Sequence, residues 1–361
     1  MITVSKLSLG KEELSAISKV IKSGQMTQGK KVAEFEQAFS KYIGTKYAVA
    51  VSSGTAALHL SLLALGIKEG DEVITTPFSF IASANAILYT GAKPVFVDID
   101  EQTFNINPRL IEQAITKKTK AIIPVHLYGL PCEMDSIQKI ARKHKLFIVE
   151  DACQAHGARF KNKKVGAIGD LGCFSFYATK NMTTVEGGMV TTNSKKLYEK
   201  LQLLRNHGSK IRYHHKILGF NLRMTDINAA IGLVQLKKLP EFNKIRMNNA
   251  SYLTKALSGI REIKVPFIPS RTTHVFHQYT IRLDKKINRR RIIEALDKKE
   301  IKTEVYYPIP IHKQKLYHSL GYSDKLPVTE EAAKSVLSLP VHPYLKNKEL
   351  KQIVSALSST L

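Results

Sequence analysis

The sequence predicts a mixed α/β protein: a large domain with a mostly parallel sheet between helices, and a smaller C-terminal α+β domain. Two observations support this prediction. Short apolar runs alternate with helical periodicity between residues 47 and 149, and the chain turns strongly helical from residue 195. A chain of 361 residues also exceeds a single minimal domain. We expect residues 1–245 to form the large domain and residues 246–361 the small one.

Local patterns predict each element of the large domain. Apolar runs predict strands over residues 47–51, 72–76, 94–97, 121–125, 146–149, 172–177 and 188–192, the last two joined by a short turn. Helical spacing predicts helices over residues 12–21, 32–43, 56–66, 79–89, 108–115 and 134–144. Strands that are apolar throughout and alternate with helices indicate a largely parallel sheet covered on both faces.

The C-terminal part mixes helices with a few strands. We expect a helix over residues 225–239 that ends at Pro240, and a second helix from Glu241 that leads into the small domain. Further on, the pattern predicts a strand over 278–283 and helices over 290–299 and 330–336.

Composition limits the class of protein. The chain has 55 Lys and Arg against 30 Asp and Glu, a net charge of +25, and most of the excess follows residue 194. Such a charge attracts anionic ligands or polyanions. Three cysteines without a CxxC spacing suggest neither a disulfide framework nor a metal site, and no apolar stretch is long enough to span a membrane. We expect a cytoplasmic protein without membrane contact.

Three features lie where strands of the predicted sheet end, which is where such sheets bind ligands. Ser52–Thr55 (SSGT) opens a helix and suits a phosphate, although the same residues make an ordinary helix cap. Asp151 follows the strand 146–149, where an acid can serve as a metal ligand, a cap, a structural carboxylate or the partner of a cationic ring nitrogen. Lys180 follows an aromatic strand among apolar, small and hydroxyl side chains, an environment that favours Schiff-base chemistry. Together these are the three parts that pyridoxal 5'-phosphate requires.

The sequence resembles the DegT/DnrJ/EryC1/StrS family of sugar aminotransferases, which are pyridoxal-phosphate enzymes of fold type I. The resemblance covers nearly the whole chain. It rests on the segments SSGTAALHL (52–60), DEVITTPFSFIASANAI (71–87), GAKPVFVDID (91–100), VEDACQAHGA (149–158), SFYATKNMTTVEGG (175–188), RNHG (205–208) and GFNLRMTDINAAIG (219–232).

The resemblance implies roles for individual residues. Lys180 corresponds to the Schiff-base lysine and proton carrier, and Asp151 to the carboxylate on the ring nitrogen. The other implied cofactor contacts are Gly54, Thr55 and Ser175 at the phosphate, Phe80 stacked on the ring, Gln154 near the ring hydroxyl or the lysine, and Asn221 reaching the phosphate of a neighbouring subunit in a homodimer. The implied substrate contacts are Met26, Thr27, Gln28, Gly29, Ser53, Tyr306 and His312, the last of which also fits an ordinary loop histidine.

The implied reaction is transamination, with an amino group passing from a donor, L-glutamate in the family, to a nucleotide-linked keto-sugar. Dehydratases of the family carry histidine at the lysine position, so Lys180 favours transamination. Alternatives are a dehydratase or a cyclitol aminotransferase of the same fold, and a regulatory or nucleic-acid-binding protein. Basic residues interleaved with aromatic ones are missing apart from Arg289–Arg291, so we expect no nucleic acid partner.

Overall fold

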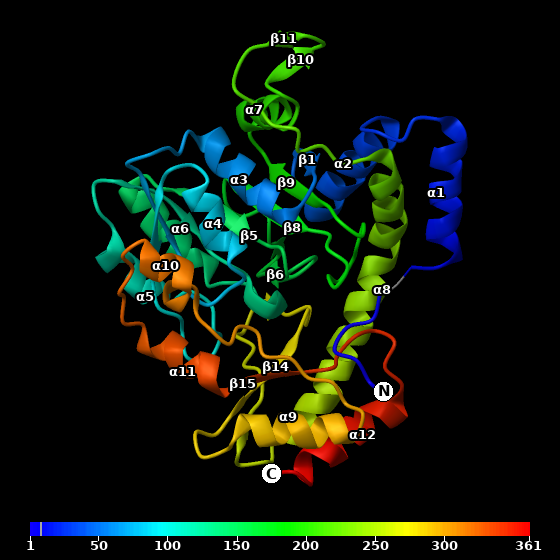
Figure 1. Ribbon diagram of the computed structural model, residues 1–361, viewed down its shortest axis with the longest axis vertical. Helices are drawn as coiled ribbons and strands as arrows, with labels where there is room; N and C mark the ends of the chain where they lie inside the picture. Colours follow the sequence, from blue (N-terminus) through cyan, green and yellow to red (C-terminus); the bar gives the residue numbers. More distant parts are fainter. Residues whose placement is uncertain (8) are drawn as a thin grey trace.

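The computed structural model describes residues 1–7 and 9–361 and has a sheet at its centre with helices on both sides (Figure 1). The sheet has seven strands in the order β1-β9-β8-β5-β4-β2-β3. Their bounds are β1 Tyr47–Val51, β2 Glu72–Thr75, β3 Lys93–Phe96, β4 Thr119–Ile123, β5 Phe147–Asp151, β8 Leu171–Ser175 and β9 Gly188–Thr192.

Strand direction in this sheet matches the predicted parallel arrangement with one exception. β3, β2, β4, β5 and β8 pair parallel to one another, whereas β9 pairs antiparallel with both β8 and β1. The predicted α/β class with a mostly parallel sheet is therefore confirmed. Because β9 runs in the opposite direction, its first residue lies at the edge where the other strands end.

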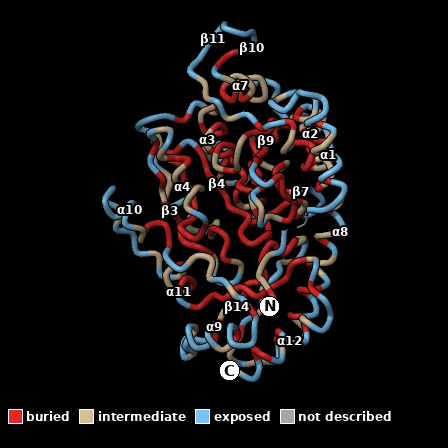
Figure 2. The backbone as a smooth tube through the Cα atoms, turned by 45° about the vertical axis from the view of Figure 1, so that its right-hand side comes forward, coloured by how far each residue is buried: buried red, intermediate tan, exposed pale blue. Residues whose placement is uncertain are grey.

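Helices cover both faces of the sheet. The helices of the first half of the chain and the helix after β9 are α1 Lys11–Ser23, α2 Lys30–Ile43, α3 Gly54–Leu65, α4 Ala82–Leu88, α5 Pro108–Ile111, α6 Met134–His144 and α7 Lys195–Arg205. Alternate strand residues point to opposite faces. Val49 and Val51 pack with α3 and α7, whereas Ala48 and Ala50 pack with α2, and α6 covers β4 and β5 on that same side. Figure 2 shows the strands as buried and the outer helices as partly exposed.

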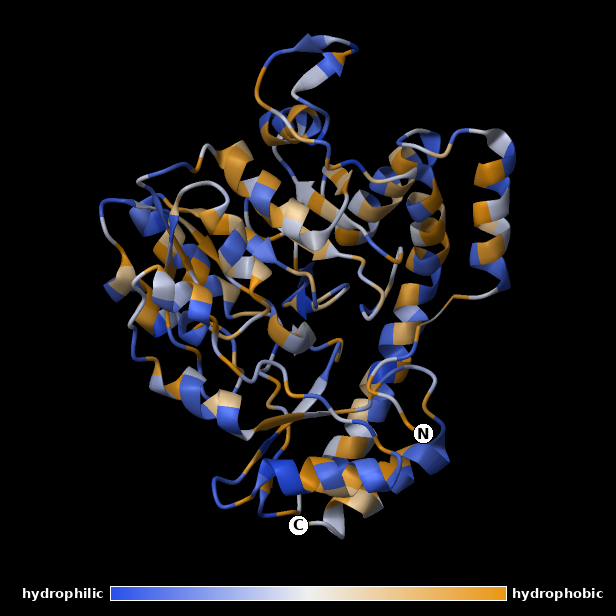
Figure 3. Ribbon diagram, in the orientation of Figure 1, coloured by the Kyte–Doolittle hydropathy of each residue, from blue (hydrophilic) through white to orange (hydrophobic). Residues whose placement is uncertain are grey.

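The C-terminal unit has its own core around a three-stranded antiparallel sheet. Its strands are β12 Ile263–Lys264, β14 Tyr279–Leu283 and β15 Val336–Leu339, and the helices of its core are α9 Arg289–Lys298 and α12 Asn347–Ser358. The two helices between them, α10 Lys315–Ser319 and α11 Pro327–Ser335, contribute their buried side chains to clusters with residues of the large domain. Apolar and polar residues alternate along α9 (Figure 3), and its apolar face is buried in this core. Ile2 joins the same core and exchanges backbone hydrogen bonds with residues 300 and 302. We retain the division after residue 245 as a proposal, with the first residues of the chain attached to the second unit.

One long helix replaces the two helices predicted around Pro240. α8 runs without a break from Asp226 to Leu257. Proline removes one backbone donor and favours a kink, which is why the sequence predicted an end there. Leu239 before the proline and Asn243 after it are both buried, so packing on both sides holds the helix together.

Two further expectations differ from the structure. The connection between β8 and β9 is a twelve-residue irregular segment, Phe176–Gly187, rather than a short turn. The predicted helix over 330–336 ends at Ser335, and the strand β15 follows it directly. A small sheet of β13 Thr272–Thr273, β6 Arg159–Phe160 and β7 Lys163–Lys164, and the hairpin of β10 Ser209–Ile211 and β11 His214–His215, complete the strands.

Candidate active site

The predicted residues gather at the edge of the sheet where the parallel strands end. Ser52–Thr55 follow β1, Asp151 ends β5 and Ser175 ends β8. The antiparallel β9 brings Gly188 to the same edge, where a Cβ on Gly188 would lie 2.2 Å from the Ser53 carbonyl oxygen. Four segments distant in sequence therefore meet here.

Two adjacent acids at the end of β5 have different surroundings. Glu150 is fully buried, and its carboxylate accepts hydrogen bonds from the amides of Gly166, Ile168 and Gly169 at 2.7–2.8 Å and lies 3.1 Å from His126 Nε2. Four hydrogen-bond partners occupy the lone pairs of this carboxylate, so Glu150 has a structural role. Asp151 accepts from the Ser83 hydroxyl at 2.7 Å and from the Cys153 amide at 3.2 Å.

Asp151 is therefore oriented but retains accepting capacity, as a carboxylate must if it is to bind a ligand's N–H group. Ser83 is a site residue that the sequence did not suggest. It lies in α4 and also contacts the Ser79 hydroxyl at 2.9 Å. The available signal was a pair of serines four residues apart, one just before α4 and one within it, shortly after the end of β2.

Lys180 lies in the irregular segment between β8 and β9 and is half-buried. Burial lowers the pKa of its amine below the ordinary value, and this effect outweighs the opposing influence of Cys153 and Asp151. Among the described residues, Lys180 forms no ion pair. A lysine with a lowered pKa and no fixed counter-ion can act as a nucleophile.

The N-terminus of α3 forms a cradle against the end of β8. Ser53 caps the helix by accepting a hydrogen bond from the Ala56 amide at 3.1 Å, which is the ordinary role that its position also allowed. A Cβ on Gly54 would lie 2.7 Å from the Ser175 Cβ and 3.0 Å from the Cys153 Sγ, so only glycine fits. The amides of Gly54 and Thr55 have no acceptor within the described part of the chain. Free amides at the start of a twelve-residue helix suit a phosphate.

Phe80 and Gln154 border the same region. Phe78 is fully buried, whereas the ring of Phe80, two residues on, is 58% exposed and thus free to stack on a ligand. The Gln154 side chain accepts from the Tyr128 amide at 2.8 Å and donates to the Tyr307 hydroxyl at 2.9 Å. Gln154 therefore links the large domain to the segment between α9 and α10.

These residues fit pyridoxal phosphate. The cradle at Gly54 would be filled by any side chain, its amides are free for a phosphate, Asp151 keeps capacity for a ring N–H, and Lys180 has the chemistry of a Schiff-base lysine. Among the described residues, no three His, Cys, Asp or Glu side chains are grouped to hold a metal ion.

Comparisons with known proteins identify the family of the chain. Residues 7–358 match the model of the DegT/DnrJ/EryC1/StrS aminotransferase family. The chain belongs to this family.

Two named relatives and a solved structure illustrate the similarity. UDP-N-acetyl-3-dehydro-alpha-D-glucosamine 3-aminotransferase from Acidithiobacillus ferrooxidans is 41% identical over 351 residues, covering 97% of this chain and 94% of the relative. GDP-perosamine synthase from Caulobacter vibrioides is 42% identical over 338 residues, covering 92% and 91%. The structure of S. venezuelae DesV in complex with a ketimine intermediate superposes with a TM-score of 0.93 at 38% identity, covering 96% and 94%. The predicted enzyme class, a pyridoxal-phosphate-dependent aminotransferase, is thereby confirmed.

In this aminotransferase, the segment Met26–Gly29 is fixed to the start of α8. The Asp226 amide lies 3.1 and 3.2 Å from the carbonyl oxygens of Met26 and Thr27, and its carboxylate accepts from the Gly29 amide at 2.8 Å. A Cβ on Gly29 would lie 2.9 Å from that carboxylate, so local packing explains the glycine. The side chains of Met26 and Thr27 are exposed, and the Gln28 Oε1 is buried without a partner in the described residues. These three side chains stay candidates for substrate contact.

The C-terminal candidates separate into two groups. Tyr306 and Tyr307 lie near the site, but it is Tyr307 that contacts Gln154, while the Tyr306 carbonyl accepts from the Tyr128 hydroxyl. The sequence reasoning named only Tyr306 of this pair. His312 is fully buried beside Glu330, 3.3 Å away, so its side chain presents no surface to a substrate in this structure.

Asn221 lies on the surface next to the predicted phosphate cradle of its own chain. It is exposed, pairs with Asn206, and is followed by Leu222, whose carbonyl accepts from the Ser52 amide at 3.0 Å. Before it, the β10–β11 hairpin projects from the body of the aminotransferase (Figure 1). Large side chains are exposed in and after this hairpin, with Tyr213 at 78% and Leu218 at 85%.

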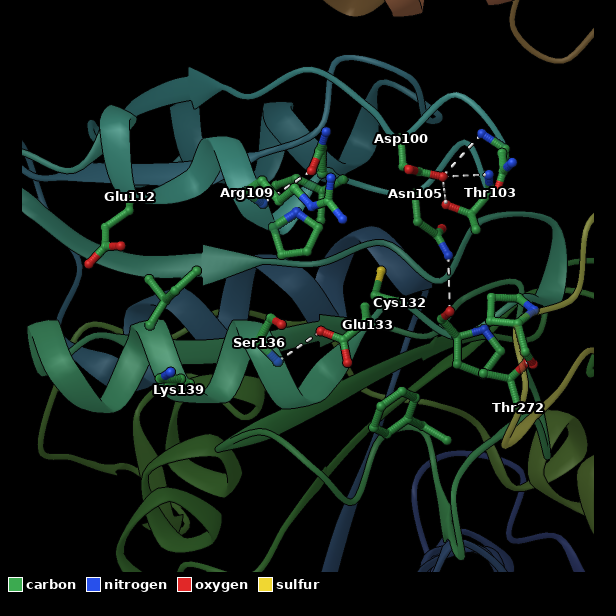
Figure 4. A pocket seen from close by; sticks show the side chains of 18 of the residues that line it. Asp100, Thr103, Asn105, Arg109, Glu112, Cys132, Glu133, Ser136, Lys139 and Thr272 are labelled. Atoms are coloured by element: carbon green, nitrogen blue, oxygen red, sulfur yellow. Dashed lines mark hydrogen bonds between the residues drawn. The ribbon is translucent and has the colours of Figure 1, made fainter.

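A separate cleft of 790 Å³ lies outside this site. It runs between α5 and α6 and is bordered by Phe160 and Phe267 (Figure 4). The acids along it are occupied by their own chain: Asp100 accepts from Thr103, and Glu133 caps α6. Lys180 and Asp151 do not line it.

Proposed function

We propose that this chain transfers an amino group to a nucleotide-linked keto-sugar and thereby makes an amino sugar. The observation that carries this function is the pairing of two groups at one sheet edge. Burial lowers the pKa of Lys180, and Asp151 accepts a hydrogen bond from Ser83 while its oxygens can still accept one from a ligand. Two relatives with about 40% identity are named for a UDP-linked substrate and a GDP-linked product, which supports this substrate class.

Bound pyridoxal phosphate would act as an electron sink for the exchange of the amino group. The chain's own residues hold and prepare this site. Free amides of Gly54 and Thr55, with Ser175, would bind the phosphate, Phe80 would stack on the ring, and Gln154 would lie at its edge. Asp151 would keep a proton on the ring nitrogen.

Lys180 would carry the proton that has to move during the reaction. Because burial lowers the pKa of its Nζ, a larger fraction of the amine is neutral at a given pH than for an exposed lysine. A neutral Nζ can accept a proton from the amino donor and return it to the product. This use of a lysine favours transamination over the dehydratase alternative, in which the family carries histidine at this position.

The substrate contacts belong to this proposal as well. Met26, Thr27, Gln28 and Ser53 lie on the large domain, and Tyr306 with its neighbour Tyr307 on the C-terminal segment. A nucleotide sugar carries a diphosphate, and the net charge of +25 would attract it over long range.

We further propose a homodimer, L-glutamate as the amino donor, and a cytoplasmic location. The exposed Asn221 and the projecting β10–β11 hairpin support the dimer, since Asn221 can reach a neighbouring cradle only if a second copy docks on this face. All three cysteines are free, which suits a reducing compartment. No helix among the described residues has the length and apolarity needed to cross a membrane.

A substrate panel tests the proposed function. Purified protein supplied with pyridoxal phosphate and L-glutamate is assayed against UDP-, GDP- and dTDP-linked keto-sugars and free keto-cyclitols, with mass spectrometry of the products. We expect an aminated nucleotide sugar and 2-oxoglutarate. A product that has lost water, amination of free cyclitols alone, or salt-sensitive DNA retention by a colourless protein would each contradict the proposal.

A further inference from the structure

The segment that carries Lys180 has little backbone support of its own. Between β8 and β9 the backbone hydrogen bonds are Phe176 N to the Gly187 carbonyl, Thr184 N to the Phe176 carbonyl, and Lys180 N to the Tyr177 carbonyl, at 2.8–2.9 Å. None of them fixes the chain immediately after Lys180. Side chains must therefore determine where the lysine lies.

α8 supplies this support from three positions on one side of the helix. Asn228 donates to the carbonyls of Thr184 and Glu186 at 2.6 and 2.9 Å, and the Gln235 Oε1 lies 3.4 Å from the Thr183 amide. Asn243 accepts from Asn181 at 2.9 Å. Positions 228, 235 and 243 are spaced by about two helical turns each, so they face the same segment.

Asn181 is the closest of these anchors to the lysine. Its side chain is 4% exposed, and its Nδ2 donates to Asn243 Oδ1 and to the Val275 carbonyl at 3.1 Å. Its Oδ1 lies 3.3 Å from His277 Nδ1. Burial keeps the pKa of His277 well below its ordinary value, so the ring is neutral and can donate from Nδ1. Both polar atoms of the Asn181 side-chain amide therefore have partners, which lie in α8 and in the segment before β14.

We propose that Asn181 is a positioning residue for Lys180, tying the reactive lysine to α8 and to residues 275–277. The inference rests on the proposed role of Lys180. Asn181 touches neither substrate nor cofactor in this account. Its function is to hold the backbone of the neighbouring residue so that the lysine amine stays in its buried position.

The groups that surround Lys180 make the effect of misplacement measurable. Among the described residues, Asp151 and Cys153 at the end of β5, and His156 and His277 behind the lysine, interact with its charge. Burial is the leading cause of its lowered pKa. If the backbone moves and the amine reaches solvent, its pKa must rise towards the value of an exposed lysine.

The test compares Asn181→Ala with a control on the other side of the lysine, Thr179→Ala, where the side chain is exposed and makes no hydrogen bond in the described chain. Full-length protein freed of cofactor is treated with limiting acetic anhydride at a series of pH values. Peptide mass spectrometry then gives, for Lys180 and for the exposed reference Lys264, the pH at which acetylation is half-maximal, which is called the midpoint below. In the wild type and Thr179→Ala, we expect the Lys180 midpoint to lie below that of Lys264. In Asn181→Ala, we expect the two midpoints to converge.

Kinetics supply an independent readout. Misplacing a reacting group by about 1 Å can cost 10²-fold in rate, so we expect Asn181→Ala to lower kcat by about 10²-fold with little change in KM. If Asn181→Ala does not fold, Asn243→Ala removes one acceptor from Asn181 and should shift both readouts in the same direction by less. An unchanged midpoint and kcat in a folded variant, or an equal effect of Thr179→Ala, would overturn the proposal. A shifted midpoint in a protein whose wild type transfers no amino group would refute the proposed function and leave the positioning role intact.

Discussion

Two neighbouring carboxylates, Glu150 and Asp151, have different surroundings, and only that of Asp151 fits the chemical role proposed for it. The Glu150 carboxylate forms hydrogen bonds with three backbone amides and a histidine, whereas the Asp151 carboxylate accepts from one serine and one amide. The sequence left both readings open for Asp151, because nothing in a linear chain shows which acid the loop 166–169 will surround.

Replacing Asp151 should separate binding from turnover. Asp151→Asn keeps the shape and the hydrogen bond from Ser83 but removes the charge, so cofactor should still bind while kcat falls by about 10²-fold or more. Visible absorbance and steady-state kinetics measure the two effects. Glu150→Gln is the control, and it should lower stability instead. Wild-type turnover in Asp151→Asn would show that this carboxylate has no part in the chemistry.

The cradle at Gly54 gives a second prediction at this scale. Gly54→Ala places a Cβ 2.7 Å from the Ser175 Cβ. This distance is too short for two carbon atoms, so either the backbone at residue 54 or Ser175 must shift. We expect cofactor affinity to fall by about tenfold or more, since 1.4 kcal/mol of lost contact is a factor of ten. Titration with pyridoxal phosphate measures it, and Gly259→Ala, where nothing lies within 4 Å, is the control. Equal affinities in the two variants would remove Gly54 from the site.

The residues that the sequence missed share one property. Ser83, Tyr307 and Asn181 act through partners 60 or more positions away in the chain. Such contacts depend on how elements pack and leave no local pattern. Lys180 could be proposed from the sequence because its local sequence departs from that of a surface lysine, and the resemblance to a family implies its role.

At the scale of elements, most strands were predicted because each is a continuous apolar run, such as Tyr47–Val51. The direction of β9 was not predicted, because its apolar sequence is like that of its parallel neighbours. The segment 176–187 before it forms no crossover helix, and the chain returns directly beside β8 in the antiparallel direction. β15 follows α11 without a turn residue, so no local signal separated strand from helix.

The continuity of α8 through Pro240 leads to a stability prediction. Alanine at this position restores a backbone hydrogen-bond donor inside a continuous helix. The side chains of Asn228, Gln235 and Asn243, before and after the proline, already contact the same segment. We expect Pro240→Ala to raise the free energy of unfolding by about 1–2 kcal/mol, the gain in helix exceeding the loss of proline's restraint on the unfolded chain. Thermal unfolding measures it. A lower Tm would mean that the proline shapes a kink which the packing requires.

At the scale of the whole molecule, buried histidines set a limit on acid stability. Burial lowers the pKa of His156 and His274 to about 3 and that of His342 to about 4. In the unfolded chain these groups take up protons near pH 6.5, so below that pH the unfolded state binds more protons than the native state. Stability must therefore fall as pH falls from about 6.5 towards 4.

His156→Leu tests the size of this effect. Both ring nitrogens of His156 are buried and no described side chain bonds to them, so leucine loses at most a weak contact with the Ser175 backbone. We expect the slope of unfolding free energy against pH below 6 to flatten by about 1.4 kcal/mol per pH unit. Denaturant unfolding at several pH values measures this slope. An unchanged slope would show that His156 is protonated in the native state.

The net charge of +25 was ambiguous in the sequence, since it fits a polyanion partner as well as an anionic substrate. The fold and the family match resolve the class of protein, because residues 7–358 match an aminotransferase family. Long-range attraction of a diphosphate then remains a reasonable use of part of the charge.

Borohydride trapping tests the central claim, that Lys180 is the reactive lysine, most directly. Protein incubated with pyridoxal phosphate is reduced and digested, and peptides are searched for the added cofactor mass. We expect the mass on the peptide that contains Lys180, and its loss in Lys180→Arg. Lys164→Arg is the matched control, because Lys164 also has a pKa lowered by burial but lies by Tyr42. Cofactor mass on another lysine, or trapping that persists in Lys180→Arg, would contradict the account.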